Sequence, residues 1–172
     1  ELQHTLGSIY ARKGNHKAAI DNFQASIEAR QAIGDFYNIG RTYNNLAAVY
    51  WGQGEHKLAT QYISQSLKEF SKVGYAYGKA MCYNNLGVIN YALGNYTQAI
   101  TQYQRSLSTR QEIGDLLGIA AIYNNLGEVY QKLGDFQQAH HYLLEAVDLL
   151  TEIGEKRFLN DAYKLLAEVE LK

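Results

Sequence analysis

The sequence predicts an all-α fold, a solenoid of tandem helical hairpins, and three observations carry that prediction. The tetrapeptide Tyr-Asn-Asn-Leu recurs at Tyr43–Leu46, Tyr83–Leu86 and Tyr123–Leu126, always at the same step along the chain. Proline is absent, so the 15 glycines remain as the candidate helix breakers. Apolar residues within the segments follow a helical period. A constant period of about 40 residues indicates an array in which each repeat packs on its neighbours.

Two glycine series divide the chain into segments of about 17 to 19 residues, a length that suits a helix. The first series is Gly14, Gly54, Gly94 and Gly134, and the second is Gly34, Gly74, Gly114 and Gly154. The sequence therefore predicts nine helices, over residues 2–13, 16–33, 36–52, 56–73, 76–92, 96–113, 116–133, 136–153 and 156–171.

Short polar side chains follow the glycines, where a helix N-cap belongs. Asn15, Asn95 and Asp135 follow glycines of the first series, and Asp35 and Asp115 follow glycines of the second. Each of these side chains can accept a hydrogen bond from a free backbone N–H group in the first helical turn. The pattern predicts a side-chain cap at all five positions.

Two residue patterns resemble the tetratricopeptide repeat. The first is the Leu-Gly-x-x-Tyr core, and the second is the Ala-x-x-x-Phe pattern of the following helix. The first occurs at Leu6–Tyr10 and Leu126–Tyr130, and at Leu46–Tyr50 with Ala47 in place of the glycine. The second occurs with different large side chains at its last position, over Ala19–Phe23, Ala59–Ile63, Ala99–Tyr103 and Ala139–Leu143.

The chain departs from that family in two respects. Its repeat is longer than the family's usual period of roughly 34 residues. Gln31, Ser71, Gln111 and Thr151 replace the usual proline. This long form resembles the repeats of Pins-type adaptors, kinesin light chains and bacterial signalling proteins. Armadillo and HEAT repeats have a similar period, but the Leu-Gly-x-x-Tyr pattern favours the tetratricopeptide interpretation. A propeller is excluded by the helical spacing.

The resemblance implies one right-handed α-solenoid domain over residues 1–172. Its repeats would cover about 1–34, 35–74, 75–114 and 115–154, with a capping helix over 155–172. Glu1 falls inside the expected first helix, so we expect the first repeat to be incomplete. Charged residues make the last segment a solvating cap; they are Lys156, Arg157, Lys164, Glu168, Glu170 and Lys172.

The resemblance also implies where a ligand would bind, because the first helix of each hairpin lines a concave groove in this family. The second asparagine of each pair matches a groove asparagine that holds a peptide, and an amide can both donate and accept hydrogen bonds. Alternatively, the pairs could bridge one repeat to the next, or persist because the repeats were copied. The candidate peptide-binding residues are Asn44, Asn45, Asn84, Asn85, Asn124, Asn125, Arg41, Trp51, Tyr91 and Glu128.

Trp51 and Tyr91 hold equivalent first-helix positions and could be exposed aromatic anchors for a partner. The alternative for both is packing within the repeat array. Only Arg41 could serve in a basic clamp on a terminal carboxylate, so a C-terminal tail is a poor ligand. The ligand is expected to be neutral or mixed in charge.

The sequence predicts a non-catalytic module that binds a peptide segment of a partner protein, as part of a larger signalling or regulatory protein. The alternative is a structural spacer, or self-association through the incomplete first repeat.

A net charge of −1 argues against nucleic acid as a partner, and no apolar run suggests a membrane span. No motif calls for a cofactor or metal, and adjacent His140 and His141 do not share a helix face. The single cysteine fits a cytoplasmic protein.

Overall fold

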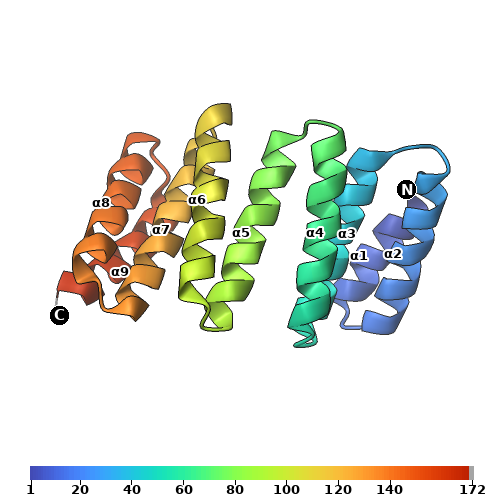
Figure 1. Ribbon diagram of the computed structural model, residues 1–172, viewed down its shortest axis with the longest axis horizontal. Helices are drawn as coiled ribbons and strands as arrows, with labels where there is room; N and C mark the ends of the chain where they lie inside the picture. The colour runs from blue at the N-terminus through green and yellow to red at the C-terminus, as the bar shows by residue number, and fades with distance from the viewer. Residues whose placement is uncertain (171–172) are drawn as a thin grey trace. The chain divides into compact units, whose positions relative to one another are not determined.

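The computed structural model describes residues 1–170, which form nine α-helices joined by short turns (Figure 1). The helices are α1 (Leu2–Arg12), α2 (His16–Gln31), α3 (Phe36–Gly52), α4 (His56–Lys72), α5 (Ala76–Ala92), α6 (Tyr96–Ile113), α7 (Leu116–Leu133), α8 (Phe136–Glu152) and α9 (Lys156–Glu170). The predicted all-α fold is confirmed, and α1, α2, α4 and α8 end one or two residues earlier than the sequence predicted. Residues 171 and 172 of the expected capping helix lie outside the described residues.

The chain divides into two compact units, with the division inside α5. In the first unit, Glu1–Asn85, α1 packs on α2 and α3 on α4, while α2 and α1 also contact α3. In the second unit, which begins at Leu86, α7 packs on α6 and α8, and α9 contacts both α8 and α7. Each unit therefore consists of consecutive antiparallel helices in hairpins (Figure 1). The grouping of both into one four-repeat domain stays a prediction.

The turn glycines end the helices as the sequence predicted. All eight glycines of the two series have φ between +65° and +78°, a left-handed conformation that side chains disfavour. Gly114 and Gly134 show the consequence most clearly, because each is a left-handed C-cap whose N–H donates to carbonyls of the last turn. The regular turns explain why the repeat keeps a constant period.

Side-chain caps are present at four of the five predicted positions. Asn15, Asp35, Asp115 and Asp135 each accept a hydrogen bond from the backbone N–H three residues later, at 3.0 to 3.3 Å. The prediction is wrong for Asn95, whose side chain makes no capping hydrogen bond. Its carbonyl oxygen alone receives the first helical bond, from Ala99 at 2.9 Å.

Tyr43, Leu46 and Tyr50 lie on the packed side of α3. Leu46 is fully buried, and the rings of Tyr43 and Tyr50 stack on Tyr62 of α4 at 6.0 and 5.2 Å. In the second unit a Cβ added at Gly127 would lie 2.5 Å from the Leu143 Cγ. The small residue of the Leu-Gly-x-x-Tyr pattern therefore lets the two helices of a hairpin approach closely.

Buried arginines connect successive hairpins, a feature that sequence reasoning missed. Arg30 donates to Thr42 Oγ1 at 3.1 Å and pairs with Asp35 at 3.6 Å. Arg110 forms the equivalent ion pair with Asp115, two repeats further along the chain. A buried guanidinium needs such partners, because an unpaired charge in the interior is costly. The sequence did carry a signal for this ion pair, because Arg30 and Asp35 recur as Arg110 and Asp115 two repeats later with the same separation.

The intervening repeat replaces this ion pair with aromatic rings. Phe70 and Tyr75 stand at the Arg30 and Asp35 positions, and their ring centroids lie 5.3 Å apart. Phe70 is 3% exposed. Phe70 and Tyr75 therefore give an aromatic lining to the pocket between α3 and α5 that is described below.

Candidate binding pockets on the first helices

The first helices of the hairpins, α1, α3, α5, α7 and α9, carry the predicted binding residues, and pockets open between neighbours within each unit. We name each pocket by its two first helices. The first unit contains the α1/α3 and α3/α5 pockets, of about 330 and 410 Å³. The second unit contains the α7/α9 pocket, of about 260 Å³.

The α3/α5 pocket brings together three predicted site residues, Arg41, Asn44 and Asn45. Arg41 is exposed, donates to Asn38 Oδ1 at 3.3 Å, and holds its guanidinium 5.8 Å from the centre of the Tyr37 ring. The pocket therefore combines a cation and two amides with aromatic walls. Its lining residues are Tyr37, Arg41, Asn44, Asn45, Phe70, Tyr75, Tyr77 and Met81.

Three tyrosine rings line the α3/α5 pocket. The rings of Tyr37 and Tyr75 meet edge to face at 4.9 Å, and the Tyr77 ring lies 6.1 Å from that of Tyr75. Burial and the neighbouring Tyr37 raise the pKa of the Tyr75 hydroxyl, which keeps it a hydrogen-bond donor at neutral pH. Tyrosines of this kind suit recognition surfaces because a rigid apolar ring ends in a polar group.

The asparagine pairs form hydrogen bonds between consecutive repeats. Asn85 donates to Asn44 Oδ1 at 2.9 Å, so that α5 is tied to α3. Asn45 Nδ2 lies 3.4 Å from His4 Nε2, which links α3 to α1 in the same way. Bridging of repeats, the alternative to ligand binding, is thus present at these asparagines. Their role in holding a peptide stays a prediction.

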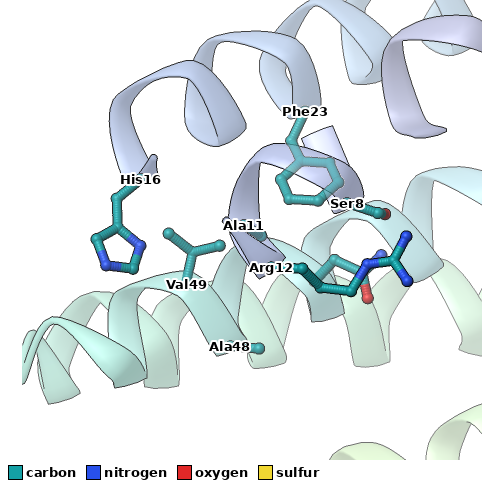
Figure 2. A pocket seen from close by; sticks show the side chains of 8 residues that line it. Ser8, Ala11, Arg12, His16, Phe23, Ala48 and Val49 are labelled. Carbon is teal, nitrogen blue, oxygen red and sulfur yellow. The ribbon is translucent and has the colours of Figure 1, made fainter. Parts of the chain in front are cut away.

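The α1/α3 pocket shares Asn45 with the α3/α5 pocket. In Figure 2, Ser8, Ala11 and Arg12 come from α1, His16 and Phe23 from α2, and Ala48 and Val49 from α3. Beside it, His4 Nδ1 lies 2.9 Å from Thr42 Oγ1. Burial, followed by the charges of Arg30 and Arg41, lowers the pKa of His4, so this histidine is neutral at pH 7.

The α7/α9 pocket contains Asn124, Asn125 and Glu128 of the predicted set. The Oδ1 atom of Asn124 is buried and has no hydrogen-bond partner among the described residues. Burial is the main cause that raises the pKa of Glu128, with a further contribution from Glu168. The residues lining this pocket are Leu117, Ala121, Asn124, Asn125, Glu128, Leu150, Phe158, Asp161 and Leu165.

The α3/α5 and α7/α9 pockets are equivalent sites, displaced by two repeats. Six lining positions coincide after a shift of two repeats, but only the two asparagines are unchanged. Arg41 becomes Ala121, and Met81 becomes Asp161. The full pairs are Tyr37 with Leu117, Arg41 with Ala121, Asn44 with Asn124, Asn45 with Asn125, Phe70 with Leu150, and Met81 with Asp161.

Trp51 and Tyr91 contact the start of the second helix in their own hairpins. The Trp51 ring lies 4.6 Å from that of His56, and the Tyr91 ring lies 5.8 Å from that of Tyr96. Both residues are half-buried, and neither lines the three pockets. Packing is therefore present at both positions, while their use as anchors stays a prediction. Asn84 also lies outside these pockets, and its amide Nδ2 lies 3.4 Å from Asn85 Oδ1.

Sequence reasoning missed the residues at the start of the first helices. Tyr37, Tyr77 and Leu117 occupy one repeat position, and all three line a pocket. Asp161 was missed because the last helix was interpreted only as a cap. Aligning that helix with the earlier first helices at the period of the repeat would have placed Asp161 at the position of Met81.

Within residues 1–170, no group of three or more His, Cys, Asp or Glu side chains is placed to hold a metal ion. Cys82 is buried beside Ser66, and burial raises its pKa to about 11, which leaves the thiol uncharged and a poor nucleophile. None of the helices in this range is both long and apolar enough to cross a membrane.

Consecutive hairpins with pockets between their first helices define the class of α-helical repeat proteins. Residues 1–68 and 79–152 match a family model described as Tetratricopeptide repeat, and a second model of that description matches residues 44–112. The chain belongs to the tetratricopeptide repeat family. The comparison with curated protein sequences finds no match.

Solved structures share the fold at low sequence identity. The chain is similar to BtubC (BKLC) from P. vanneervenii, with TM-score 0.86 and 22% identity over 95% of this chain and 68% of that one. It is similar to the apo form of RapI, with TM-score 0.88 and 20% identity over 99% and 62%. A Rap protein complexed with Competence and Sporulation Factor gives TM-score 0.76 and 20% identity over 97% and 47%. The chain thus spans about half to two thirds of these structures' lengths.

Proposed function

We propose that this chain is a non-catalytic protein–protein interaction module that binds a peptide segment of a partner along its first helices. The observation that carries the proposal is the α3/α5 pocket. There Arg41 and the amides of Asn44 and Asn45 share one opening with Tyr37 and Met81. A pocket with aromatic walls and a few polar groups is the usual form of a recognition site.

The chemistry of the α3/α5 pocket suits an extended peptide. A peptide backbone presents both donors and acceptors, and an asparagine amide matches either. Arg41 and the tyrosines belong to the residue types that contribute most to binding at protein interfaces. A ligand of neutral or mixed charge fits, because Arg41 is the one cation among the described residues that line this pocket.

The comparison with solved structures adds a precedent for the fold. A Rap protein of the same fold is complexed with a factor named for competence and sporulation. Since this chain spans 47% of that protein, we propose that it likewise serves as the recognition arm of a larger signalling or regulatory protein. The helices supply the surface, and any further activity of the whole protein would come from elsewhere in its sequence.

A peptide-display screen followed by titration calorimetry tests the proposal. We expect a selected peptide to bind the wild type, and Tyr37→Ala or Arg41→Ala to weaken it at least about 10-fold. Lys57→Ala is the matched control, because Lys57 is exposed on α4 and lines none of the pockets described. Equal affinity of all three variants would place the binding elsewhere. Enzymatic turnover that depended on Arg41 would contradict a non-catalytic role.

Self-association is the second candidate, and exposed apolar side chains near the start of the chain favour it. Leu2 is 74% exposed and Ile33 is 77% exposed. Exposed apolar surface of this kind can join two copies of a protein. Light scattering across a concentration series separates the candidates. Assembly that Leu2→Glu and Ile33→Glu abolish, without any peptide ligand from the screen, would favour the structural role.

A further inference from the structure

We infer that the α7/α9 pocket recognises the cationic side chain, arginine or lysine, of a partner peptide. The inference rests on the proposed function for its peptide context and adds the chemistry of one ligand residue. It follows from three features of the residues that line this pocket, which are a buried oxygen without a donor, two carboxylates and several apolar side chains.

Asn124 supplies the unpaired acceptor. The equivalent oxygen of Asn44 accepts a hydrogen bond from Asn85 in the next first helix. At the α7/α9 pocket the next first helix carries Leu165 in place of that asparagine, and Leu165 has no side-chain donor. Within residues 1–170, the Asn124 oxygen is therefore buried without a partner. A buried acceptor without a donor is costly, and a ligand N–H group that reached it as the lining side chains moved aside would remove that cost.

Carboxylates make a cationic donor the best match. Glu128 and Asp161 both line the pocket, and none of the described residues that line it carries a positive charge. Burial raises the pKa of Glu128, which shows that its charge is poorly solvated there. A guanidinium or ammonium group would supply donors to Asn124 and a compensating charge for the carboxylates.

The apolar side chains that line the pocket suit the stem of the same ligand side chain. Leu117, Leu150 and Phe158 line the pocket alongside the polar groups. Arginine and lysine bury their methylene groups on apolar surface while the charged end reaches polar partners. A volume of about 260 Å³ accommodates one such side chain but not a folded segment.

Nearby cations leave the carboxylates available. Lys164 lies 3.5 Å from Asp161, but the two side chains are 66% and 68% exposed, so this pair contributes little and can exchange. Lys132 acts on Glu128 from the same helix without lining the pocket. Arg157 holds its guanidinium 5.2 Å from the centre of the Phe158 ring, also outside the lining set.

The probes for the test are N-acetyl-arginine amide and N-acetyl-lysine amide, titrated into the isotope-labelled chain and followed by NMR. N-acetyl-citrulline amide is the neutral analogue of the first. We expect saturable shifts of the Asn124 side-chain amide and the Ala121 backbone amide, with a dissociation constant on the order of 1 mM. Citrulline should bind at least about 10-fold more weakly. The α3/α5 pocket, where Arg41 and Met81 replace Ala121 and Asp161, should show no shift at Asn44.

Three substitutions locate the effect. Asp161→Asn and Glu128→Gln keep the shape of exposed or half-buried side chains, and each should weaken arginine binding at least about 5-fold. Asn124→Leu removes the unpaired acceptor and should abolish binding. A melting temperature at or above that of the wild type would show that the variant is folded.

The outcomes distinguish this inference from the proposed function. Shifts that are absent, unaffected by these substitutions, or equal for citrulline overturn the inference. If a peptide from the display screen binds through Tyr37 and Arg41 while these probes do not bind, only the inference fails. If the probes bind and the screen yields no peptide, the cation site stands and the peptide-binding function fails.

Discussion

The α3/α5 and α7/α9 pockets occupy equivalent positions in the repeat, yet they carry opposite charge. Arg41 gives the first a cation, and Asp161 and Glu128 give the second two carboxylates. Both pockets are lined by an asparagine pair and by one buried apolar side chain, which is Phe70 in the first and Leu150 in the second. The difference teaches that the shared positions build the hairpin array, whereas the variable positions decide which ligand a pocket can take.

The asparagines themselves differ between the two pockets, although their sequence is identical. Asn44 has its hydrogen bond from Asn85, and Asn124 has none at its oxygen from any described residue. The cause lies in the next first helix, where the array supplies Asn85 in one case and Leu165 in the other. The same residue type therefore bridges two helices at one site and leaves a buried oxygen without a donor at the other.

The largest difference should appear when the pocket floors are truncated. Phe70 is 3% exposed and Leu150 is 1% exposed. We expect Phe70→Ala to reduce the free energy of unfolding by about 3–5 kcal/mol and Leu150→Ala by about 2–5 kcal/mol, because each leaves a cavity. Urea denaturation measures both, and Lys57→Ala again serves as an exposed control. A loss below about 1 kcal/mol at either site would show that the floor is not tightly packed.

Substitution of the two equivalent asparagines should have effects of opposite sign. Asn44→Leu removes the acceptor of the Asn85 amide and should destabilise the protein by about 0.5–1.5 kcal/mol. Asn124→Leu removes a buried oxygen that has no partner within residues 1–170 and places an apolar side chain beside Leu117 and Leu165, so it should stabilise the protein by up to about 1 kcal/mol. The free energy of unfolding in urea checks the pair. An equal change in the free energy of unfolding for Asn44→Leu and Asn124→Leu would show that the two asparagines do not differ in their contribution to stability.

The sequence was sufficient to predict the fold because every hairpin carries the same short-range sequence features. Helical spacing, turn glycines and the small residue at Gly127 all recur at a fixed period, and each acts on residues close in the chain. The pockets depend instead on pairs such as Asn44 with Asn85, which lie in different repeats and meet only after stacking. The sequence marked both asparagines but could not show which of their oxygens would be left without a donor.

Glu128 offers a smaller test, through pH. Burial holds its folded pKa above the unfolded value of 4.5, so the folded state binds the proton more tightly. Stability from this group is present at low pH and is lost as pH rises through the folded pKa. Glu128→Gln should therefore stabilise the protein at pH 7, by less than about 1 kcal/mol because the side chain is partly solvated, and not at about pH 4. Thermal melts at both values test this, and stabilisation of the same size at both would implicate packing instead of charge.

His4 extends the comparison to a third site, because it stands one repeat before Asn44 and two before Asn84. Burial and the charges of Arg30 and Arg41 lower its folded pKa below the unfolded value of 6.5, so the unfolded chain binds the proton more readily. The contribution of His4 to stability is full above about pH 6.5 and declines as pH falls towards the folded pKa. His4→Asn places the residue of the later repeats at this position and should flatten the change in melting temperature between about pH 7 and pH 5.5. His141→Gln, which removes an exposed histidine of α8, is the matched control. If the melting temperature of His4→Asn changed with pH as steeply as that of the wild type, protonation of His4 would not be what opposes folding. The contact between Asn45 and His4 would then not require a neutral histidine.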